Sequence, residues 1–513
     1  MKKRRLSKKQ KVLMTAALVD LVIPFSVLAS TVSAEIPYQT FLDFAKNRGQ
    51  FTPGLQDIYI YDKSDNIVGV LNAPMPDFSS SDLSGISTLV SPQYLAGVKH
   101  NRGYTHVNFG YSTEGYNVID RNNDPSRDFH APRLNKLVTE VASVPFSPQG
   151  TEKGAYKNAS RYTAFYRMGS GSQYIKHPNG RIDAITGAYG YLTGGTVGTP
   201  TYSSDVIVIH PGNTFNSSNG PLASVGESGD SGSPLFAYDS YEKKWVLVSV
   251  LSAGNKYGIT NWLTTIPPDF IKKTIDEDTL PDIVSHTSAT PIIWTFDSKT
   301  GRGVLSQQAA FSTDAQGQVG TDLNKGKNLI FAGANNSTIN ITNDIKQGGG
   351  SLTFKNNYTV TSTNQSTWTG AGVDIQDNAT VSWKVNGVAG DNLHKIGKGT
   401  LLVNGSGVNK GGLKVGDGVV VLNQQADSTG KVQAFNHVNI ASGRPTLVLS
   451  NSQQVNPDNI SWGFRGGVLD THGNNITFHR LNAADYGAII TNLAKDVSAI
   501  TLNPDQSSDK GKA

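Results

Sequence analysis

The residues of this chain best suited to chemistry form the hexapeptide Gly229-Asp230-Ser231-Gly232-Ser233-Pro234. A serine hydroxyl attacks a carbonyl when a base removes its proton and hydrogen-bond donors receive the oxyanion that forms. The small residues around Ser231 would let two backbone N–H groups, those of Gly229 and Ser231, converge on one point. Runs of Gly, Asp and Ser are also common in turns, so the motif by itself leaves both interpretations open.

Two nearby serines are weaker candidates for the nucleophile. Ser228 lacks the flanking glycines and Ser233 precedes a proline, so we expect both of them in turns. The Gly-x-Ser-x-Gly elbow of α/β-hydrolases is not met either, because Ser233 occupies its last position. The sequence therefore favours Ser231 and disfavours a lipase fold.

A serine nucleophile of this kind needs a histidine as its base and a carboxylate that holds the imidazole tautomer. In trypsin-like double β-barrels the histidine precedes the serine in the chain. Five of the ten histidines do so: His100, His106, His130, His177 and His210. His100 ends the small-residue segment Leu95-Ala96-Gly97-Val98-Lys99, just past an expected strand. That setting would place an imidazole on the rim of a barrel, so we expect His100 to be the base.

Three aspartates that follow His100 compete to orient it. Asp124 precedes a proline and is typical of a turn, and Asp120 lies beside an arginine with which it could form a solvated ion pair. Asp128 leads into an apolar segment, where an acid has to be held by a partner. We favour Asp128, and Asp120 is the alternative.

Two further expectations concern the surroundings of the site. Ser252, Ala253 and Gly254 follow an expected strand, and we expect them to form one wall of a specificity pocket. In many trypsin-like proteases the acid before the serine pairs with a newly cut N-terminal amine. Our hypothesis is that Glu35 supplies such an amine to Asp230.

The segments that would position these residues have the pattern of β-strands. Apolar runs at 58–61 and 67–70 flank a polar turn and predict a hairpin, whose acidic turn lacks the spacing of a calcium loop. The run 244–251, directly after the serine motif, predicts a further strand. Prolines at 267, 268 and 281 mark the end of this region, so we expect residues 35–290 to form one enzymatic domain.

From about residue 300 the sequence pattern changes. Short apolar triplets now recur between Gly and Asn turns, spaced irregularly by roughly ten to thirty residues. Examples lie at 329–331, 339–341, 352–354, 381–383, 401–403, 413–415, 419–422 and 447–449. Short strands with such corners predict a solenoid of parallel β-coils over 300–513. A β-sandwich is the alternative.

The first 34 residues differ from the rest of the chain. A basic head precedes a largely apolar run over 12–29 and the small residues Val32-Ser33-Ala34. This pattern predicts a secretory signal peptide over 1–34, cleaved before Glu35. An uncleaved anchor is the alternative, which Asp20, Pro24 and the shortness of the apolar run disfavour.

Charge and cysteine content limit the choice of partner and compartment. The formal net charge is +5, and residues 1–34 hold seven basic residues and one acid, so the mature chain is close to −1. The basic pI is therefore no evidence for a nucleic-acid partner, and we expect none.

The chain has no cysteine, although exported proteins of this size usually have disulfides. Passage through a narrow second membrane pore would explain this, because a cross-linked loop would block it.

Longer segments make the chain recognisable. They are Gly97–Asn101, Asp120–Asn123, Asp128–Leu134, Leu192–Gly198, Gly226–Phe236, Gly390–Gly397 and Ala441–Pro445. On these segments the chain resembles the serine protease autotransporters of enterobacteria, in the immunoglobulin-A-protease-like group. The resemblance spans nearly all of residues 35–490, and within the group it looks strongest to haemoglobin proteases and temperature-sensitive haemagglutinins.

The resemblance implies that the family's catalytic histidine, aspartate and serine fall on His100, Asp128 and Ser231. It implies an all-β chain, a trypsin-like double β-barrel followed by a right-handed parallel β-helix stalk. It also implies a secreted endopeptidase that cleaves host proteins, such as haemoglobin or mucin-type glycoproteins. Family members cross the periplasm and reach the cell surface through a C-terminal translocator barrel in the outer membrane. The sequence ends at Ala513 in a polar tail without such strands, so we interpret it as a passenger portion with a truncated stalk.

We expect no cofactor, no metal and a monomer. The alternative function is an adhesin or haemagglutinin that binds host cells or matrix through the stalk, with proteolysis secondary. Direct haem binding is a weaker third idea. It would use exposed histidines of the second half, His394, His437, His472 or His479, although such histidines are more often plain surface residues.

Overall fold

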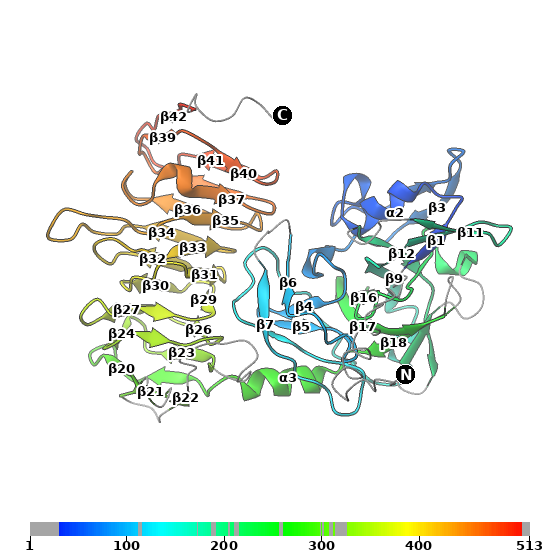
Figure 1. The fold of residues 1–513 in the computed structure, drawn as a ribbon, viewed down its shortest axis with the longest axis horizontal. Helices are drawn as coiled ribbons and strands as arrows, with labels where there is room; N and C mark the ends of the chain where they lie inside the picture. The colour runs from blue at the N-terminus through cyan, green and yellow to red at the C-terminus, as the bar shows by residue number, and fades with distance from the viewer. Residues whose placement is uncertain are drawn as a thin grey trace, which may run out of the picture.

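The chain folds into two units that lie side by side and are joined by one helix (Figure 1). The computed structural model describes residues 30–504 except 111–114, 172, 186–190, 204–205, 210–214, 256–259, 298, 300–301, 307–310 and 313–325. We call residues 30–277 the two-barrel unit and residues 283–502 the solenoid. The α-helices in these described residues are α2 (Tyr38–Ala45) and α3 (Pro268–Glu277). Neither of them is long and apolar enough to cross a membrane.

Five antiparallel strands form the first curled sheet, in the order β4-β5-β8-β7-β6. They are β4 (Thr88–Ser91), β5 (Tyr94–Ala96), β6 (His106–Val107), β7 (Tyr116–Asp120) and β8 (Arg133–Leu134). Leu89, Leu95, Val118 and Leu134 belong to the buried core of this sheet. His100 follows β5, and Asp128 precedes β8, which is the neighbour of β5 in the sheet.

Seven antiparallel strands form the second curled sheet, in the order β12-β9-β16-β17-β18-β14-β13. They are β9 (Tyr162–Gly169), β12 (Thr193–Val197), β13 (Thr201–Ser203), β14 (Val206–Ile209), β16 (Pro234–Asp239), β17 (Lys244–Gly254) and β18 (Asn261–Thr265). Side chains alternate between two cores: Leu235 and Val248 face one, and Phe236 and Leu247 face the other. The strand expected over 244–251 is confirmed and extends to Gly254.

A four-stranded sheet, in the order β11-β10-β1-β15, completes the two-barrel unit. Its strands are β1 (Thr31–Ser33), β10 (Gln173–Lys176), β11 (Ile182–Ile185) and β15 (Ser224–Val225). Ser30, Thr31 and Val32 are fully buried, and β1 pairs with a strand on each side. Cleavage at the expected leader boundary, after residue 34, would remove this central strand. The rest of the expected leader, residues 1–29, lies outside the described residues.

The expected hairpin is confirmed as β2 (Ile58–Tyr61) and β3 (Ile67–Leu71), which pair antiparallel. Asp62 closes its turn by accepting hydrogen bonds from the backbone N–H groups of Ser64 and Asn66, at 2.8 and 2.9 Å. The role of Asp62 in this turn is thus to accept the turn's own backbone hydrogen bonds.

Two long sheets run along the solenoid. One contains β19 (Ile283–Ser285), β23 (Leu329–Gly333), β26 (Ser351–Phe354), β29 (Gly372–Ile375), β31 (Asn392–Ile396), β33 (Gly412–Val415), β35 (Val438–Ile440), β37 (Ile460–Trp462) and β40 (Asn482–Ala483). The other contains β20 (Ile292–Asp297), β21 (Arg302–Leu305), β22 (Phe311–Ser312), β24 (Ser337–Ile341), β27 (Tyr358–Ser362), β30 (Thr380–Trp383), β32 (Thr400–Val403), β34 (Val419–Leu422), β36 (Thr446–Leu449), β38 (Gly467–Asp470) and β41 (Ala488–Thr491). Two short pairs, β25 (Ile345–Lys346) with β28 (Trp368–Thr369) and β39 (Ile476–Phe478) with β42 (Ile500–Leu502), lie at corners.

Successive coils of the solenoid stack in register. Leu329 lies against Leu352 and Phe331 against Phe354, and the last two rings stack with centroids 5.4 Å apart. From β23 to β40 the strands of the first sheet pair parallel, one strand per coil, which confirms the β-solenoid and excludes the sandwich. The solenoid begins at Ile283, inside the region that the sequence assigned to the enzymatic domain, because β19 already pairs with β23.

Candidate active site

The three side chains expected to carry catalysis meet where the two curled sheets adjoin. His100 Nε2 lies 2.8 Å from Ser231 Oγ, and His100 Nδ1 lies 2.6 Å from Asp128 Oδ2. The backbone N–H of His100 also donates to Asp128 Oδ1 at 3.0 Å. The side chains of His100 and Asp128 are 48 % and 33 % exposed, so a substrate can reach the imidazole.

The proton positions follow from the chemistry of the partners. An ionised carboxylate only accepts hydrogen bonds, so the Nδ1 that faces Asp128 carries the imidazole proton. The lone pair of Nε2 then points at the hydroxyl of Ser231, which donates to it. This is the tautomer that a general base for Ser231 requires.

The loop around Ser231 depends on two glycines. Gly229 and Gly232 adopt φ angles of +99° and +93°, which residues with a Cβ rarely adopt. A Cβ on Gly232 would lie 2.1 Å from the carbonyl oxygen of Ile86, so that position also requires the absence of a side chain. The glycines therefore allow the tight turn that presents the Ser231 hydroxyl.

The expected oxyanion donors are available in this loop. Within the described part of the chain, neither the Gly229 N–H nor the Ser231 N–H donates a hydrogen bond to another group. The side-chain amide of Asn101 donates to the carbonyl oxygen of Ser231 at 3.0 Å and so holds the loop against the first sheet. Sequence reasoning did not single out Asn101, although its position directly after His100 was a usable signal.

Asp230 lies fully buried behind the nucleophile. Its Oδ2 accepts from an Arg167 guanidinium N–H at 2.8 Å, and its Oδ1 accepts from the Gly171 N–H at 3.2 Å. The Ser30 backbone nitrogen and hydroxyl also donate to Oδ2, at 3.1 and 2.9 Å. The hypothesis that Glu35 reaches Asp230 is therefore wrong: the Glu35 N–H donates to Ser33 Oγ, and Ser30 occupies the place beside Asp230.

The two competing aspartates, Asp120 and Asp124, accept hydrogen bonds from residues of their own turns. Asp120 Oδ1 accepts from the Asn122 N–H at 3.2 Å, and burial raises the Asp120 pKa. Asp124 Oδ1 accepts from the backbone N–H and the hydroxyl of Ser126, at 2.8 and 2.9 Å. Neither carboxylate contacts His100, so the structure brings only Asp128 of these three acids to the imidazole.

The other histidines that precede Ser231 make different contacts. His130 is fully buried and its Nε2 is hydrogen-bonded to the Tyr104 hydroxyl at 2.8 Å, and burial lowers its pKa to about 3. His177 pairs with Asp183 at 2.7 Å on the β10–β11 hairpin. His106 lies 3.4 Å from the Thr105 hydroxyl. His210 lies outside the described residues.

The segment expected to wall a specificity pocket lies at the end of β17. Ser252 donates its hydroxyl proton to the Trp262 carbonyl at 2.9 Å, while Ala253 and Gly254 are exposed. The buried amide of Asn261 exchanges two hydrogen bonds with the backbone of Gly226, each of 2.7 Å, and so ties the start of the serine loop to the strand beside this segment. The segment thus lies next to the serine loop, with small, accessible residues.

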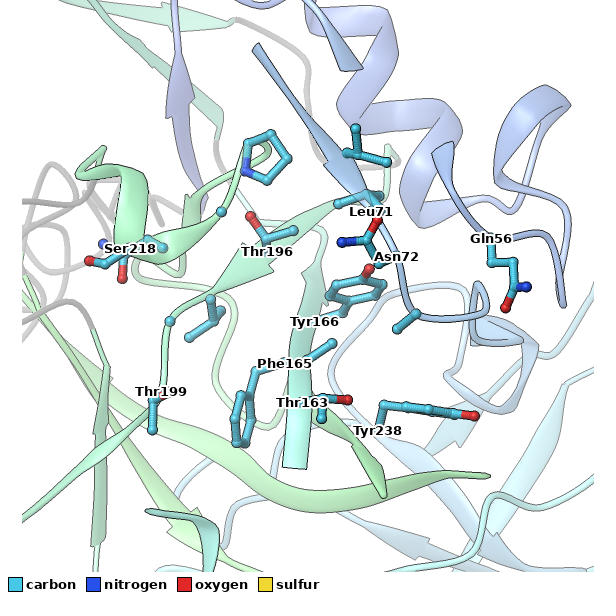
Figure 2. Close-up of a pocket in the computed structure, with 18 of the residues that line it drawn as sticks. Gln56, Leu71, Asn72, Thr163, Phe165, Tyr166, Thr196, Thr199, Ser218 and Tyr238 are labelled. Carbon is cyan, nitrogen blue, oxygen red and sulfur yellow. The ribbon is translucent and has the colours of Figure 1, made fainter. Parts of the chain in front are cut away.

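A groove of about 550 Å³ lies elsewhere on the two-barrel unit (Figure 2). Gln56, Asn72, Thr163 and Tyr238 line it from four separate segments. It shares no residue with the three catalytic candidates and has no titratable pair suited to acid–base work. This groove is therefore separate from the proposed catalytic residues.

The described residues contain no group of three or more His, Cys, Asp or Glu side chains placed to hold a metal ion. His394 is not exposed as expected. It is 4 % exposed and hydrogen-bonds the Leu137 carbonyl at 2.7 Å, between the solenoid and the two-barrel unit. Burial holds its pKa well below the usual value. His479 and His472 are exposed, and His479 pairs with Asp458 at 3.0 Å.

A serine, histidine and aspartate in this geometry, on two curled antiparallel sheets, define a serine-peptidase type of site. Residues 29–269 match the family model described as immunoglobulin A1 protease, which covers nearly the whole two-barrel unit. The chain is 51 % identical over 510 residues to the serine protease SepA autotransporter of Shigella flexneri, a match that covers 98 % of this chain and 37 % of that protein. It is 48 % identical over 497 residues to the serine protease EatA of Escherichia coli O78:H11, with 95 % and 36 % covered.

Among solved structures, the Hap adhesin of Haemophilus influenzae superposes with a TM-score of 0.85 at 33 % identity, covering 93 % of this chain and 55 % of that one. The chain is thus similar over almost its whole length to serine protease autotransporters, and it spans little more than a third of the length of the curated relatives it matches. These comparisons support the wider family and do not single out the haemoglobin proteases.

Proposed function

We propose that the two-barrel unit is a serine endopeptidase in which Ser231 is the nucleophile, His100 the general base and Asp128 the acid that orients it. The observation that carries the proposal is the continuous line of contacts from Ser231 Oγ through both imidazole nitrogens to Asp128, at 2.8 and 2.6 Å. The match of residues 29–269 to the immunoglobulin A1 protease family supports the same reaction.

The proposed reaction has two steps, acylation of Ser231 and hydrolysis of the acyl-serine. His100 Nε2 takes the Ser231 proton as Oγ attacks the scissile carbonyl, and the N–H groups of Gly229 and Ser231 receive the oxyanion. His100 then gives that proton to the leaving amine, and the C–N bond breaks to leave an acyl-serine. A water, deprotonated by His100, hydrolyses the ester and restores Ser231. Asp128 keeps the proton on Nδ1 and stabilises the imidazolium in both halves.

We further propose that substrates are proteins outside the bacterial cell, and that Ser252, Ala253 and Gly254 line the entrance for the residue before the scissile bond. Haemoglobin and mucin-type glycoproteins are proposed substrates by analogy with the family. Relatives named as autotransporters support export to the surface and a translocator domain in the full-length protein. The chain is expected to act as a monomer and without a cofactor.

The second proposed function is adhesion to host cells or matrix through the solenoid. One observation favours it: the chain superposes at a TM-score of 0.85 on a protein described as an adhesin. The exposed side chains of the solenoid strands would present the binding surface, and proteolysis would then be secondary.

One experiment tests both proposals. The full chain and its Ser231→Ala variant are incubated with a protein-derived peptide library, and both are applied to host cells and matrix proteins. We expect cleavage by the wild type alone; cleavage by the variant at the wild-type rate would refute the catalytic assignment. Binding that persists in the variant would support adhesion, and the absence of binding by both proteins would refute it.

A further inference from the structure

The residues that carry His100 and Asp128 form one antiparallel run. Leu95 N–H donates to the Pro132 carbonyl at 2.9 Å, and Gly97 and His130 exchange two backbone hydrogen bonds of 3.2 and 3.0 Å. Tyr94 pairs with Arg133 at the inner end of this run. At the outer end the His100 N–H donates to Asp128 at 3.0 Å. The catalytic pair is therefore the last rung of a ladder that starts at Tyr94 and Arg133.

The inner rung of this ladder is fixed in the solenoid. Arg133 is fully buried, and its guanidinium donates to three acceptors there: the Gly326 carbonyl at 2.7 Å, the Gly349 carbonyl at 3.0 Å and Asn328 Oδ1 at 3.2 Å. Gln93, the residue before Tyr94, donates to the same Gly349 carbonyl and to the Leu134 carbonyl. The two strands of the ladder thus converge on the Gly349 carbonyl of the solenoid.

A single carboxylate joins both residues of the inner rung. Asp278, at the end of α3, accepts from the Tyr94 hydroxyl at 2.8 Å, and its other oxygen lies 3.5 Å from the Arg133 guanidinium. Its own carbonyl accepts from the Asn328 N–H at 2.8 Å, so the carboxylate is itself tied to the solenoid. Burial raises the pKa of Tyr94, which therefore stays a hydrogen-bond donor to Asp278.

We propose that Arg133 is a positioning residue for the catalytic pair, through which the first coils of the solenoid set the distance between His100 and Asp128. This inference rests on the proposed serine-peptidase function. Three acceptors in the solenoid and the carboxylate of Asp278 hold the buried Arg133 guanidinium from several sides, so the inner rung has little freedom to shift. The rungs between are backbone hydrogen bonds, which pass that position to His100 and Asp128. A displacement of about 1 Å at a reacting group can cost on the order of 10²-fold in rate.

A matched control lies three residues away. Lys136 also crosses from the two-barrel unit to the solenoid, where its ammonium donates to the Gly370 carbonyl at 2.6 Å and to Asp391 at 2.7 Å. It follows the end of β8 and forms no rung of the ladder. Lys136→Met removes a contact between the two units, whereas Arg133→Met also releases the inner rung.

The test measures kcat, KM and the rate of labelling by a fluorophosphonate, a probe that reads the activated serine without a peptide subsite. For full-length Arg133→Met we expect kcat and the labelling rate to fall about 10- to 100-fold, with KM changed less than about threefold. Arg133→Lys, which keeps a donor to the solenoid carbonyls, should recover part of the loss. Lys136→Met should stay within about threefold of the wild type in every quantity.

Tyr94→Phe removes only the hydroxyl that binds Asp278 and decides the matter if Arg133→Met does not fold. We expect it to lower kcat and labelling by about 3- to 10-fold at an unchanged KM. Wild-type kcat and labelling in a folded Arg133→Met variant would overturn the inference. If Arg133→Met does not fold, wild-type kcat and labelling in Tyr94→Phe would overturn it. A loss in Lys136→Met equal to that in Arg133→Met would overturn it as well. Ser231→Ala, measured in parallel, separates this outcome from failure of the proposed function, because activity in that variant would refute the serine mechanism itself.

Discussion

Ser30 and Asp230 are 200 residues apart in the chain, yet the Ser30 backbone nitrogen and hydroxyl both donate to the same Asp230 oxygen, at 3.1 and 2.9 Å. Both residues are fully buried, and Asp230 directly precedes the proposed nucleophile. The start of β1 therefore packs against the catalytic loop from behind. This contact relates the first described residue of the chain to the position of Ser231.

The first prediction concerns the mature N-terminus, which we expect to be Ser30. Residues Val27-Leu28-Ala29 offer the small residue that signal peptidase requires before its cut, and cleavage there preserves β1. Cleavage before Glu35 would delete a buried strand paired on both sides. Intact mass and N-terminal sequencing of the exported protein measure this directly. A mature chain that begins at Glu35 would contradict the role assigned to β1.

The second prediction is that Asp230→Asn lowers both stability and activity. The substitution leaves the Arg167 guanidinium, 2 % exposed, without its counter-charge, and breaking a buried pair costs about 3–5 kcal/mol. Because Asp230 also anchors the loop of Ser231, we expect kcat to fall by about 10-fold or more. Urea unfolding and peptide hydrolysis give the two values.

A surface pair serves as the control for Asp230→Asn. Glu242 lies 3.9 Å from Lys244, and both side chains are about half exposed. Solvent screens such a pair, so Glu242→Gln should leave the unfolding midpoint and kcat nearly unchanged. Equal effects of the two substitutions would show that Asp230 has no special role.

The third prediction separates the two aspartates that the sequence left as alternatives. Asp128→Asn should reduce kcat by on the order of 10³–10⁴-fold, because an amide no longer holds the proton on His100 Nδ1. Asp120→Asn should stay within a few-fold of the wild type, since Asp120 accepts from backbone N–H groups of its own turn and does not contact His100. Steady-state kinetics on the folded variants measure both. A large loss in Asp120→Asn alone would reverse the assignment.

Local patterns explain how much of this protein the sequence could predict. The serine loop and its glycines are contiguous, so Ser231 and its proposed oxyanion donors were readable as one motif. The apolar triplets of the solenoid were readable as well, because each strand buries alternate residues of a short segment, as in Val419–Leu422. The sequence favoured Asp128 over Asp120 as the orienting acid because an apolar segment follows Asp128. In the structure, it is the strand pairing of Tyr94 with Arg133 that brings Asp128 to His100.

The contacts that the sequence could not predict join distant segments. Strand β8 has only two residues, too few for a periodic pattern to identify it, so the pairing of Tyr94 with Arg133 was invisible. The bonds from Arg133 to Gly326 and Gly349 span about 200 residues and end on backbone carbonyls, which any residue could supply. The buried role of residues 30–34 was hidden because small residues suit a cleavage site and a central strand equally.

The last prediction is that stability falls in acid partly because His130 is buried as the neutral imidazole. Burial lowers its folded-state pKa to about 3, whereas an unfolded histidine titrates near 6.5. Below pH 6.5 the unfolded chain binds a proton that the folded chain refuses. The contribution of His130 is therefore complete above about pH 7 and is lost as the pH falls toward 3, by on the order of 3 kcal/mol at pH 4. His130→Gln keeps a hydrogen-bonding side chain beside the Tyr104 hydroxyl and removes the titration. Urea unfolding of both proteins between pH 4 and 7 should show a shallower pH dependence for the variant, and identical slopes would show that His130 accepts its proton in the folded state.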